Sequence, residues 1–173
     1  MKTHFASLTA ALLVASAGIA QAETNVKLTQ MHICCGGCTK AIVAATKDLL
    51  GAKVTVDQDN EEVSIAAESK EAAQKAVDAI LAAGYHAKTD SGDVTIADDS
   101  GAKPGNVKRL EVSGVHNCCG ACTSAIKDAV KSVAGYQADT CKPKQQSFVV
   151  EGDFDAQALV KALNEAGFHV TVK

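Results

Sequence analysis

Along the first half of the chain, hydrophobic positions alternate with polar ones in some stretches and recur with helical spacing in others. Residues 26–28, 54–56 and 63–67 show the alternation that predicts half-buried strands. Residues 42–49 and 73–80 place hydrophobic side chains three and four positions apart, which predicts helices. The polar run between the second and third strands predicts a hairpin turn.

The second half of the chain repeats this order, and short hydrophobic stretches at 85–88 and 168–172 predict a last strand in each half. Two segments are almost the same: residues 31–42 read MHICCGGCTKAI and residues 115–126 read VHNCCGACTSAI. Residues 91–105, rich in Gly, Asp and Ser, separate the copies and are typical of a linker. The chain is therefore predicted to contain one small module twice.

Each module has the order strand, helix, strand, strand, helix, strand, which predicts an α+β, ferredoxin-like βαββαβ fold. Right-handed crossovers require the strand order 4-1-3-2 in one antiparallel sheet, with two helices on one face. We expect modules at 23–90 and 106–173, and a linker at 91–105 in which 94–97 is a candidate for a short extra strand. This topology brings the cysteine segment and the start of the last strand to the same end of a module.

The first 22 residues predict export. Lys2 precedes an apolar run at 8–20 that is too short to span a bilayer as an anchor, and Ala-Gln-Ala at 20–22 resembles a cleavage site. We expect a signal peptide at 1–22, a soluble mature chain that begins at Glu23, and a periplasmic location.

The remaining chain offers no sign of a nucleic-acid or membrane partner. The formal net charge is −3, and the sequence contains no run of basic residues. No later segment is long and apolar enough to predict insertion of the mature chain into a membrane.

Six of the seven cysteines gather in two clusters: Cys34, Cys35 and Cys38, then Cys118, Cys119 and Cys122. A disulfide framework usually distributes cysteines along the chain, so this clustering favours metal or redox chemistry, although export also permits disulfides. The seventh, Cys141, is expected near the second hairpin, two strands from the cluster, and is interpreted as a spare thiol.

The clusters come directly before predicted helices, and a helix N-terminus favours the thiolate that binds metals. His32 and His116 stand two positions before the first cysteine of their cluster and are candidate ligands or partners of ligands. His86 and His169, in the last predicted strands, are weaker candidates. Three sulfurs would permit a trigonal site, and an added histidine a tetrahedral one.

On the Cys-x-x-Cys motif between the first strand and first helix, each half resembles the heavy-metal-associated domain of copper chaperones and the periplasmic mercury-binding protein. The resemblance implies that each half holds one soft ion on its motif, and that the aromatic residue that starts the last strand shields the metal. These positions are Cys35 with Cys38, Cys119 with Cys122, and the aromatics Tyr85 and Phe168.

The resemblance also implies metal binding, trafficking or sequestration, with a metal transporter or another metal-binding domain as partner. Cu(I) is the favoured ion, and Zn(II), Hg(II) and cadmium are alternatives. The chain departs from the family by placing Cys34 and Cys118 directly beside the pairs, either as third ligands or as thiols that only pack.

Two other functions remain open: a periplasmic thiol–disulfide exchanger or sensor, and a module that recognises a transporter without using its thiols. The redox hypothesis lacks the cis-proline of thioredoxin-like enzymes, because the only prolines are Pro104 in the linker and Pro143 in a hairpin. Thr39 and Thr123 stand where a c-type haem motif needs histidine. No carboxylate pair, catalytic triad or phosphate loop is present, so no enzymatic activity is expected.

Overall fold

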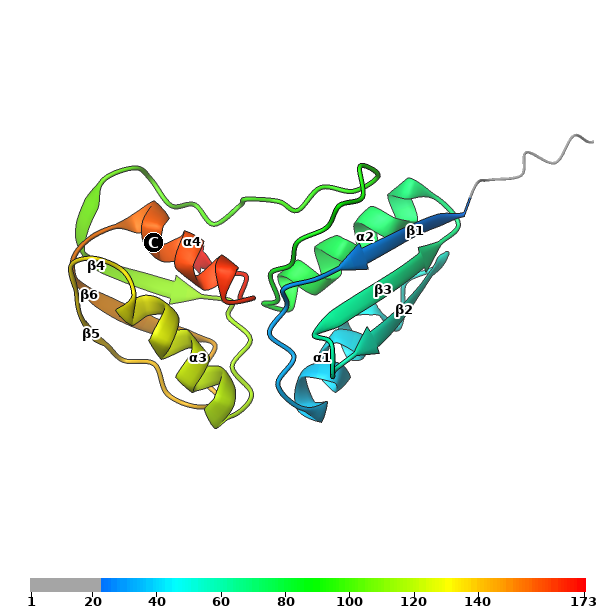
Figure 1. The fold of residues 1–173 in the computed structure, drawn as a ribbon. Coiled ribbons are helices and arrows are strands. Elements are labelled where there is room, and N and C mark those ends of the chain that lie inside the picture. The colour runs from blue at the N-terminus through cyan, green and yellow to red at the C-terminus, as the bar shows by residue number, and fades with distance from the viewer. Residues whose placement is uncertain (1–22) are drawn as a thin grey trace, which may run out of the picture.

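The computed structural model describes residues 23–173, so the predicted signal peptide at 1–22 lies outside the described residues. Within this range the chain forms an α+β structure with four helices and two antiparallel sheets, arranged as two halves side by side (Figure 1). No helix in residues 23–173 combines the length and the apolar character needed to cross a membrane.

The first half contains three strands and two helices: β1 (Thr24–Leu28), α1 (Gly36–Thr46), β2 (Ala52–Asp57), β3 (Glu62–Ala67) and α2 (Lys70–Ala82). Its sheet has the order β1-β3-β2, with antiparallel neighbours. Every second side chain of β1 is buried, as the alternation of its sequence predicts. The Ser69 side chain accepts a hydrogen bond from the Ala72 N–H and so caps the start of α2.

The second half contains four strands and two helices: β4 (Asn106–Ser113), α3 (Gly120–Lys131), β5 (Tyr136–Asp139), β6 (Ser147–Asp155), α4 (Ala156–Glu165) and β7 (Thr171–Val172). Its sheet has the order β5-β6-β4-β7, again antiparallel. Asp155 caps α4 by accepting from the Ala158 N–H.

The predicted last strands differ from the structure. In the first half, residues 85–88 form only isolated bridges, Thr29 with Lys88 and Tyr85 with Phe168, and in the second half the strand shortens to β7. The reason is that the beginning of each predicted strand pairs with the other half instead of extending its own sheet.

The predicted extra strand at 94–97 does not form, and the linker crosses between α2 and β4 without a helix or strand (Figure 1). The Gln74 side chain takes the place of a sheet partner: it accepts from the Thr95 N–H and donates to the Thr95 carbonyl. A side chain thus satisfies both backbone groups of this residue.

Each half buries hydrophobic side chains between its sheet and its helices. Leu28, Ile42 and Ile80 are fully buried in the first half, and Val112 and Leu159 in the second. These residues occupy the positions that the alternating and helical patterns assign to the interior. The core therefore supports the loops that carry the cysteines, and it includes the buried Cys38 and Cys122.

The two halves dock through the corners that follow α2 and α4. The His86 N–H donates to the Gly167 carbonyl at 3.0 Å, and the His169 N–H donates to the Gly84 carbonyl at 3.1 Å. Gly84 and Gly167 have φ values of +88° and +84°, and a Cβ on Gly84 would collide with the backbone nitrogen of His116. Glycine is required here both by the left-handed conformation and by the close approach of the halves.

Candidate metal centre

The two cysteine clusters, expected to act separately, lie together between the halves, where the loops before α1 and α3 approach each other (Figure 1). The Sγ of Cys34 lies 3.6 Å from the Sγ of Cys119 and 3.6 Å from that of Cys122. Cys119 and Cys122 are themselves 3.8 Å apart. One thiol of the first half thus completes a triangle with the Cys-x-x-Cys pair of the second.

The relationship is reciprocal. The Sγ of Cys118 lies 3.9 Å from those of both Cys35 and Cys38, the pair of the first half. Each additional thiol also contacts the last cysteine of its own motif. Cys34 lies 3.7 Å from Cys38, and Cys118 lies 3.8 Å from Cys122. The six sulfurs therefore form one continuous network.

Local sequence explains how the loops present these sulfurs. Buried Ile33 and Val115 anchor the loops beneath the clusters. Cys35 and Cys119 occupy the N-cap positions of α1 and α3 without a side-chain capping bond, so their sulfurs stay available. A Cβ on Gly37 would lie 3.3 Å from the Cys35 Sγ and 3.4 Å from the Cys118 Sγ, tighter than usual contact.

The sulfur spacing suits a shared metal ion. A metal–thiolate bond of about 2.3 Å places two sulfurs about 3.8 Å apart in a tetrahedral site, about 4.0 Å in a trigonal site and about 4.6 Å in a linear one. The observed contacts of 3.6–3.9 Å match three or four ligands and are shorter than a linear pair requires. All seven cysteines are free thiols.

His116 contributes a nitrogen to the network. One of its ring nitrogens lies with the sulfurs of Cys38, Cys118 and Cys122 in a group whose atoms are all within 4.8 Å of one another. Its buried Nε2 has no hydrogen-bond partner, and its ring stacks on Tyr85 of the other half at 4.3 Å between centroids. A buried nitrogen without a partner, next to three sulfurs, is a candidate ligand.

His32 occupies the corresponding place on the other side. It forms a group with Cys34 and Cys122 within the same limit of 4.8 Å, and its buried Nε2 also lacks a partner. Its ring lies against Phe168 of the other half at 4.7 Å. Burial lowers the pKa of His32, which favours the neutral form that binds metals.

Hydrogen bonding and burial divide the thiols into two kinds. A hydrogen bond from Cys122 lowers the pKa of Cys38 and correspondingly raises that of Cys122, so Cys38 is the more acidic thiol of this pair. Burial raises the pKa of Cys34 and raises that of Cys118 to about 12. A backbone N–H lowers the pKa of Cys119 to about 7.

The weaker candidates His86 and His169 lie outside the metal-ligand groups found among residues 23–173. Their rings stack on each other at 5.8 Å between centroids with planes 2° apart. His169 is buried and its Nε2 pairs with the Asp99 carboxylate at 2.8 Å. These two histidines belong to the contact between the halves.

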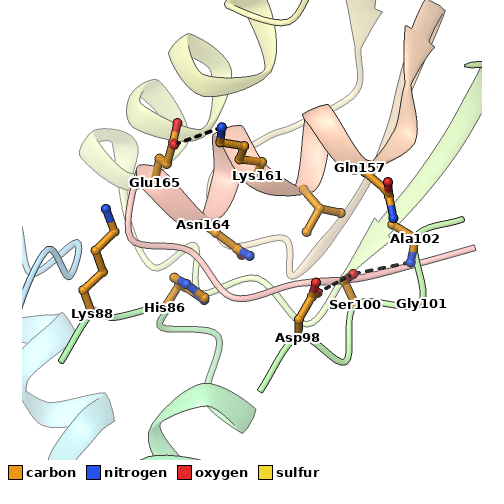
Figure 2. Close-up of a pocket in the computed structure, with 11 residues that line it drawn as sticks. His86, Lys88, Asp98, Ser100, Gly101, Ala102, Gln157, Lys161, Asn164 and Glu165 are labelled. Carbon is orange, nitrogen blue, oxygen red and sulfur yellow. Dashed lines mark hydrogen bonds and ion pairs between the residues drawn. The ribbon is translucent and has the colours of Figure 1, made fainter. Parts of the chain in front are cut away.

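His86 also lines a groove of about 640 Å³ between the halves (Figure 2). Its other walls come from the linker, with Asp98 and Ser100, and from α4, with Lys161 and Asn164. The charges of both signs on these walls are mostly open to solvent.

Cys141 is buried and is not part of the sulfur network; its Sγ accepts a hydrogen bond from the Asn117 side chain at 3.6 Å. Sequence reasoning missed Asn117. Its amide donates to the carbonyls of Lys142 and Gln145, and its oxygen accepts from the Thr123 hydroxyl at 2.8 Å. Asn117 thereby ties the second cysteine loop to the hairpin. The sequence did hold a signal: Asn117 is polar, whereas the corresponding residue of the first copy, Ile33, is apolar.

Comparison with known proteins supports a metal-related module. The family model for the heavy-metal-associated domain matches residues 109–169. No curated protein matches the chain.

Two solved structures align along most of the chain. One is the solution structure of the N-terminal soluble domains of Bacillus subtilis CopA, with 15% identity and a TM-score of 0.34, covering 88% of this chain and 95% of that one. The other is the first two RRM domains of yeast poly(U) binding protein Pub1, with 10% identity and a TM-score of 0.27, covering 87% and 98%.

The family match covers the loop with Cys118, Cys119 and Cys122 and the elements that support it. The first half lies outside the match but contributes the other three sulfurs of the network. The likeness to the heavy-metal-associated domain is thus found over residues 109–169, about a third of the chain.

Proposed function

We propose that this chain is an exported heavy-metal-binding protein that holds soft metal ions, above all Cu(I), on the thiolates of its two Cys-Cys-x-x-Cys motifs. The observation that carries the proposal is the convergence of six free cysteine sulfurs, at spacings of 3.6–3.9 Å, beside two buried histidine nitrogens without partners. Buried polar atoms without partners are uncommon, and a bound ion would satisfy them.

The ligand set favours a soft ion. Thiolates select Cu(I), zinc and other thiophilic metals, whereas calcium and magnesium require oxygen ligands. Sulfur spacings that suit three or four ligands fit Cu(I) or zinc better than the linear coordination of Hg(II). Zn(II), Hg(II) and cadmium remain the alternatives. Binding releases the thiol protons to solvent, so affinity should rise with pH.

The proposed role is trafficking or sequestration of the metal, without catalysis. Residues 1–22 would direct export, and the mature chain would begin at Glu23. Exposed loops carry the cysteines at the junction of the halves, where a metal transporter or another metal-binding domain could exchange an ion with them.

The test is metal analysis of the mature chain, purified under reducing conditions and loaded anaerobically with Cu(I) or Zn(II). We expect at least one retained Cu(I) per half after desalting. A variant with all six clustered cysteines changed to Ser should retain none, while Cys141→Ser should bind as the parent does. Less than about half an equivalent of any metal per half would contradict the proposal.

Thiol–disulfide exchange is the second candidate, because the Cys119 thiol has a pKa of about 7 and lies 3.8 Å from Cys122. A thiol of this pKa is a competent nucleophile near neutral pH. A variant that keeps only the Cys119 and Cys122 pair separates the two hypotheses. Disulfide reductase turnover without metal retention would favour redox chemistry, and the reverse would favour metal binding.

A further inference from the structure

We propose that the two halves do not hold separate ions but build one polynuclear Cu(I)–thiolate centre across their interface, in which Cys34 and Cys118 bridge metal ions. This inference rests on the proposed function, because it requires that the cysteines bind a soft metal. It adds that neither half has a complete site alone.

The first argument is that each half places one sulfur against the cysteine pair of the other half. Cys34 contacts both members of the opposite pair, Cys119 and Cys122, at 3.6 Å. It also contacts Cys38 of its own half at 3.7 Å. A sulfur in contact with sulfurs on two sides can bind one ion on each side, which is what a bridging thiolate does. Cys118 has the same three kinds of contact on the other side of the interface.

The second argument is the number of bonds. Bridging by Cys34 and Cys118 alone gives about eight metal–sulfur bonds, and bridging by all six thiolates gives about twelve, enough for up to about four three-coordinate Cu(I) ions. Two isolated Cys-x-x-Cys sites would hold only one ion each. The expected stoichiometry therefore separates the shared centre from two independent sites.

The third argument concerns charge. Six thiolates around about four Cu(I) ions leave an excess of about two negative charges, and the N-termini of α1 and α3 both face the sulfurs and stabilise negative charge there. Cys35 and Cys119, the N-caps of these helices, place one sulfur beside each terminus. A shared centre uses both helix termini at once.

The fourth argument is enclosure from both sides. His116, with Tyr85 stacked on it, closes one side of the network, and His32, with Phe168 against it, closes the other. In each pair the histidine and the aromatic come from different halves. The Tyr85 hydroxyl also donates to the Cys38 carbonyl at 3.2 Å. Docking of the halves therefore both assembles the sulfurs and places an aromatic and a histidine ring on each of two sides of them.

The docking itself does not depend on the cysteines. Backbone hydrogen bonds at Gly84 and Gly167 join the halves, and His116 also donates its N–H to the Gly84 carbonyl at 3.4 Å. The sulfur network is thus held in place before any metal arrives, which reduces the entropy lost on binding.

The test is anaerobic Cu(I) titration of the full mature chain, followed by native mass spectrometry. We expect a species with more than two and up to about four Cu(I) ions to appear cooperatively, with few chains holding one or two. In the variant Cys34→Ser, Cys35→Ser, Cys38→Ser this species should disappear, and the intact second half should keep at most one ion. Cys141→Ser should titrate as the parent does.

A second variant leaves every thiol in place. Gly84→Ala introduces a Cβ that collides with the His116 backbone, whereas Gly51→Ala, at a φ of +74°, would meet mainly the Glu68 side chain. Both substitutions strain a left-handed residue, but only Gly84→Ala should separate the halves and lower the Cu(I) count to two or fewer.

Three results together would overturn the shared centre: binding is stepwise and stops at two Cu(I) ions, the triple serine variant retains one of them, and Gly84→Ala has no effect. Metal binding itself would then stand. Failure of the parent to retain any metal would instead overturn the proposed function and this inference together.

Discussion

The Sγ of Cys34 lies 3.6 Å from the Sγ of Cys119, a residue 85 positions further along the chain and in the other half of the molecule. The additional cysteine of each motif, Cys34 or Cys118, contacts the cysteine pair of the opposite half as well as the last cysteine of its own motif. This relationship joins two short motifs into a single six-thiol network, in which Cys34 and Cys118 are expected to be ligands.

Changing Cys34 to Ser should weaken metal binding at the pair in the other half. The lost thiolate is a direct ligand in our proposal, so affinity for Cu(I) should fall by about 10- to 100-fold or more. Loss of a residue that only hydrogen-bonds to a metal ligand already costs about this much, so the range is a minimum. Competition with a Cu(I) chelator measures this loss. Cys118→Ser should lower the affinity to a similar extent.

Cys141→Ser is the matched control for these variants, because its thiol is buried outside the network. Far-ultraviolet circular dichroism should show that all three variants keep the fold. If Cys34→Ser and Cys118→Ser hold Cu(I) as tightly as Cys141→Ser does, the additional thiols are not ligands.

The contact between the halves should weaken in acid. Burial lowers the pKa of His86 to about 4, with the neighbouring His169 acting in the same direction, while in the unfolded chain this pKa returns to its ordinary value near 6.5. Between these values the unfolded state binds more protons, so His86 contributes stability above about pH 6.5 that is lost as pH falls toward 4.

Chemical unfolding of the metal-free chain at a series of pH values measures this contribution. His86→Gln should flatten the fall in the free energy of unfolding between pH 6.5 and 4, since glutamine does not titrate. An unchanged pH profile in His86→Gln would contradict the assignment. The other charged or titratable groups near this contact are present in both proteins, so their effect on the pH profile is common to both. They are Asp98, Asp99, Lys88 and His169.

Asn117→Ala should destabilise the second half by about 1–3 kcal/mol, because it removes the hydrogen bonds that the amide donates to the carbonyls of Lys142 and Gln145 and the one it accepts from the Thr123 hydroxyl. Thermal and urea unfolding measure the change. Asn106→Ala is the control, since that exposed side chain bonds only Asp153 and should alter stability little.

Asn117→Ala should also open access to Cys141. That thiol is buried beside the Asn117 amide, and burial raises the thiol's pKa to about 11, so we expect little alkylation in the parent. Mass-spectrometric counting of labelled cysteines should show faster labelling at Cys141 in the variant. Equal labelling rates in the two proteins would mean that Asn117 does not hold this corner closed.

Much of each half follows from local patterns in the sequence. Alternation at β1 and helical spacing in α2 place Val26, Leu28 and Ile80 in the interior, where the structure has them. The position of the cysteines before a helix also follows, because the motif stands between a strand pattern and a helix pattern.

The junction of the halves could not be predicted in the same way. It relies on the backbone carbonyls of Gly84 and Gly167, which leave no periodic signal in the sequence. Pairing of Tyr85 with Phe168 likewise replaced the predicted last strands, because a contact between halves outweighed local alternation. The recurrence of a glycine before both aromatics was the one trace of this contact in the sequence.

The most direct test of the six-thiol network as one metal site is X-ray absorption spectroscopy at the copper edge of the fully loaded, reduced mature chain. The shared centre predicts a shell of three sulfurs around each copper together with a short copper–copper scattering path, both lost in the variant Cys34→Ser, Cys118→Ser. Two sulfurs per copper and no copper–copper path in the parent would contradict it, because the two Cys-x-x-Cys pairs would then bind their ions independently.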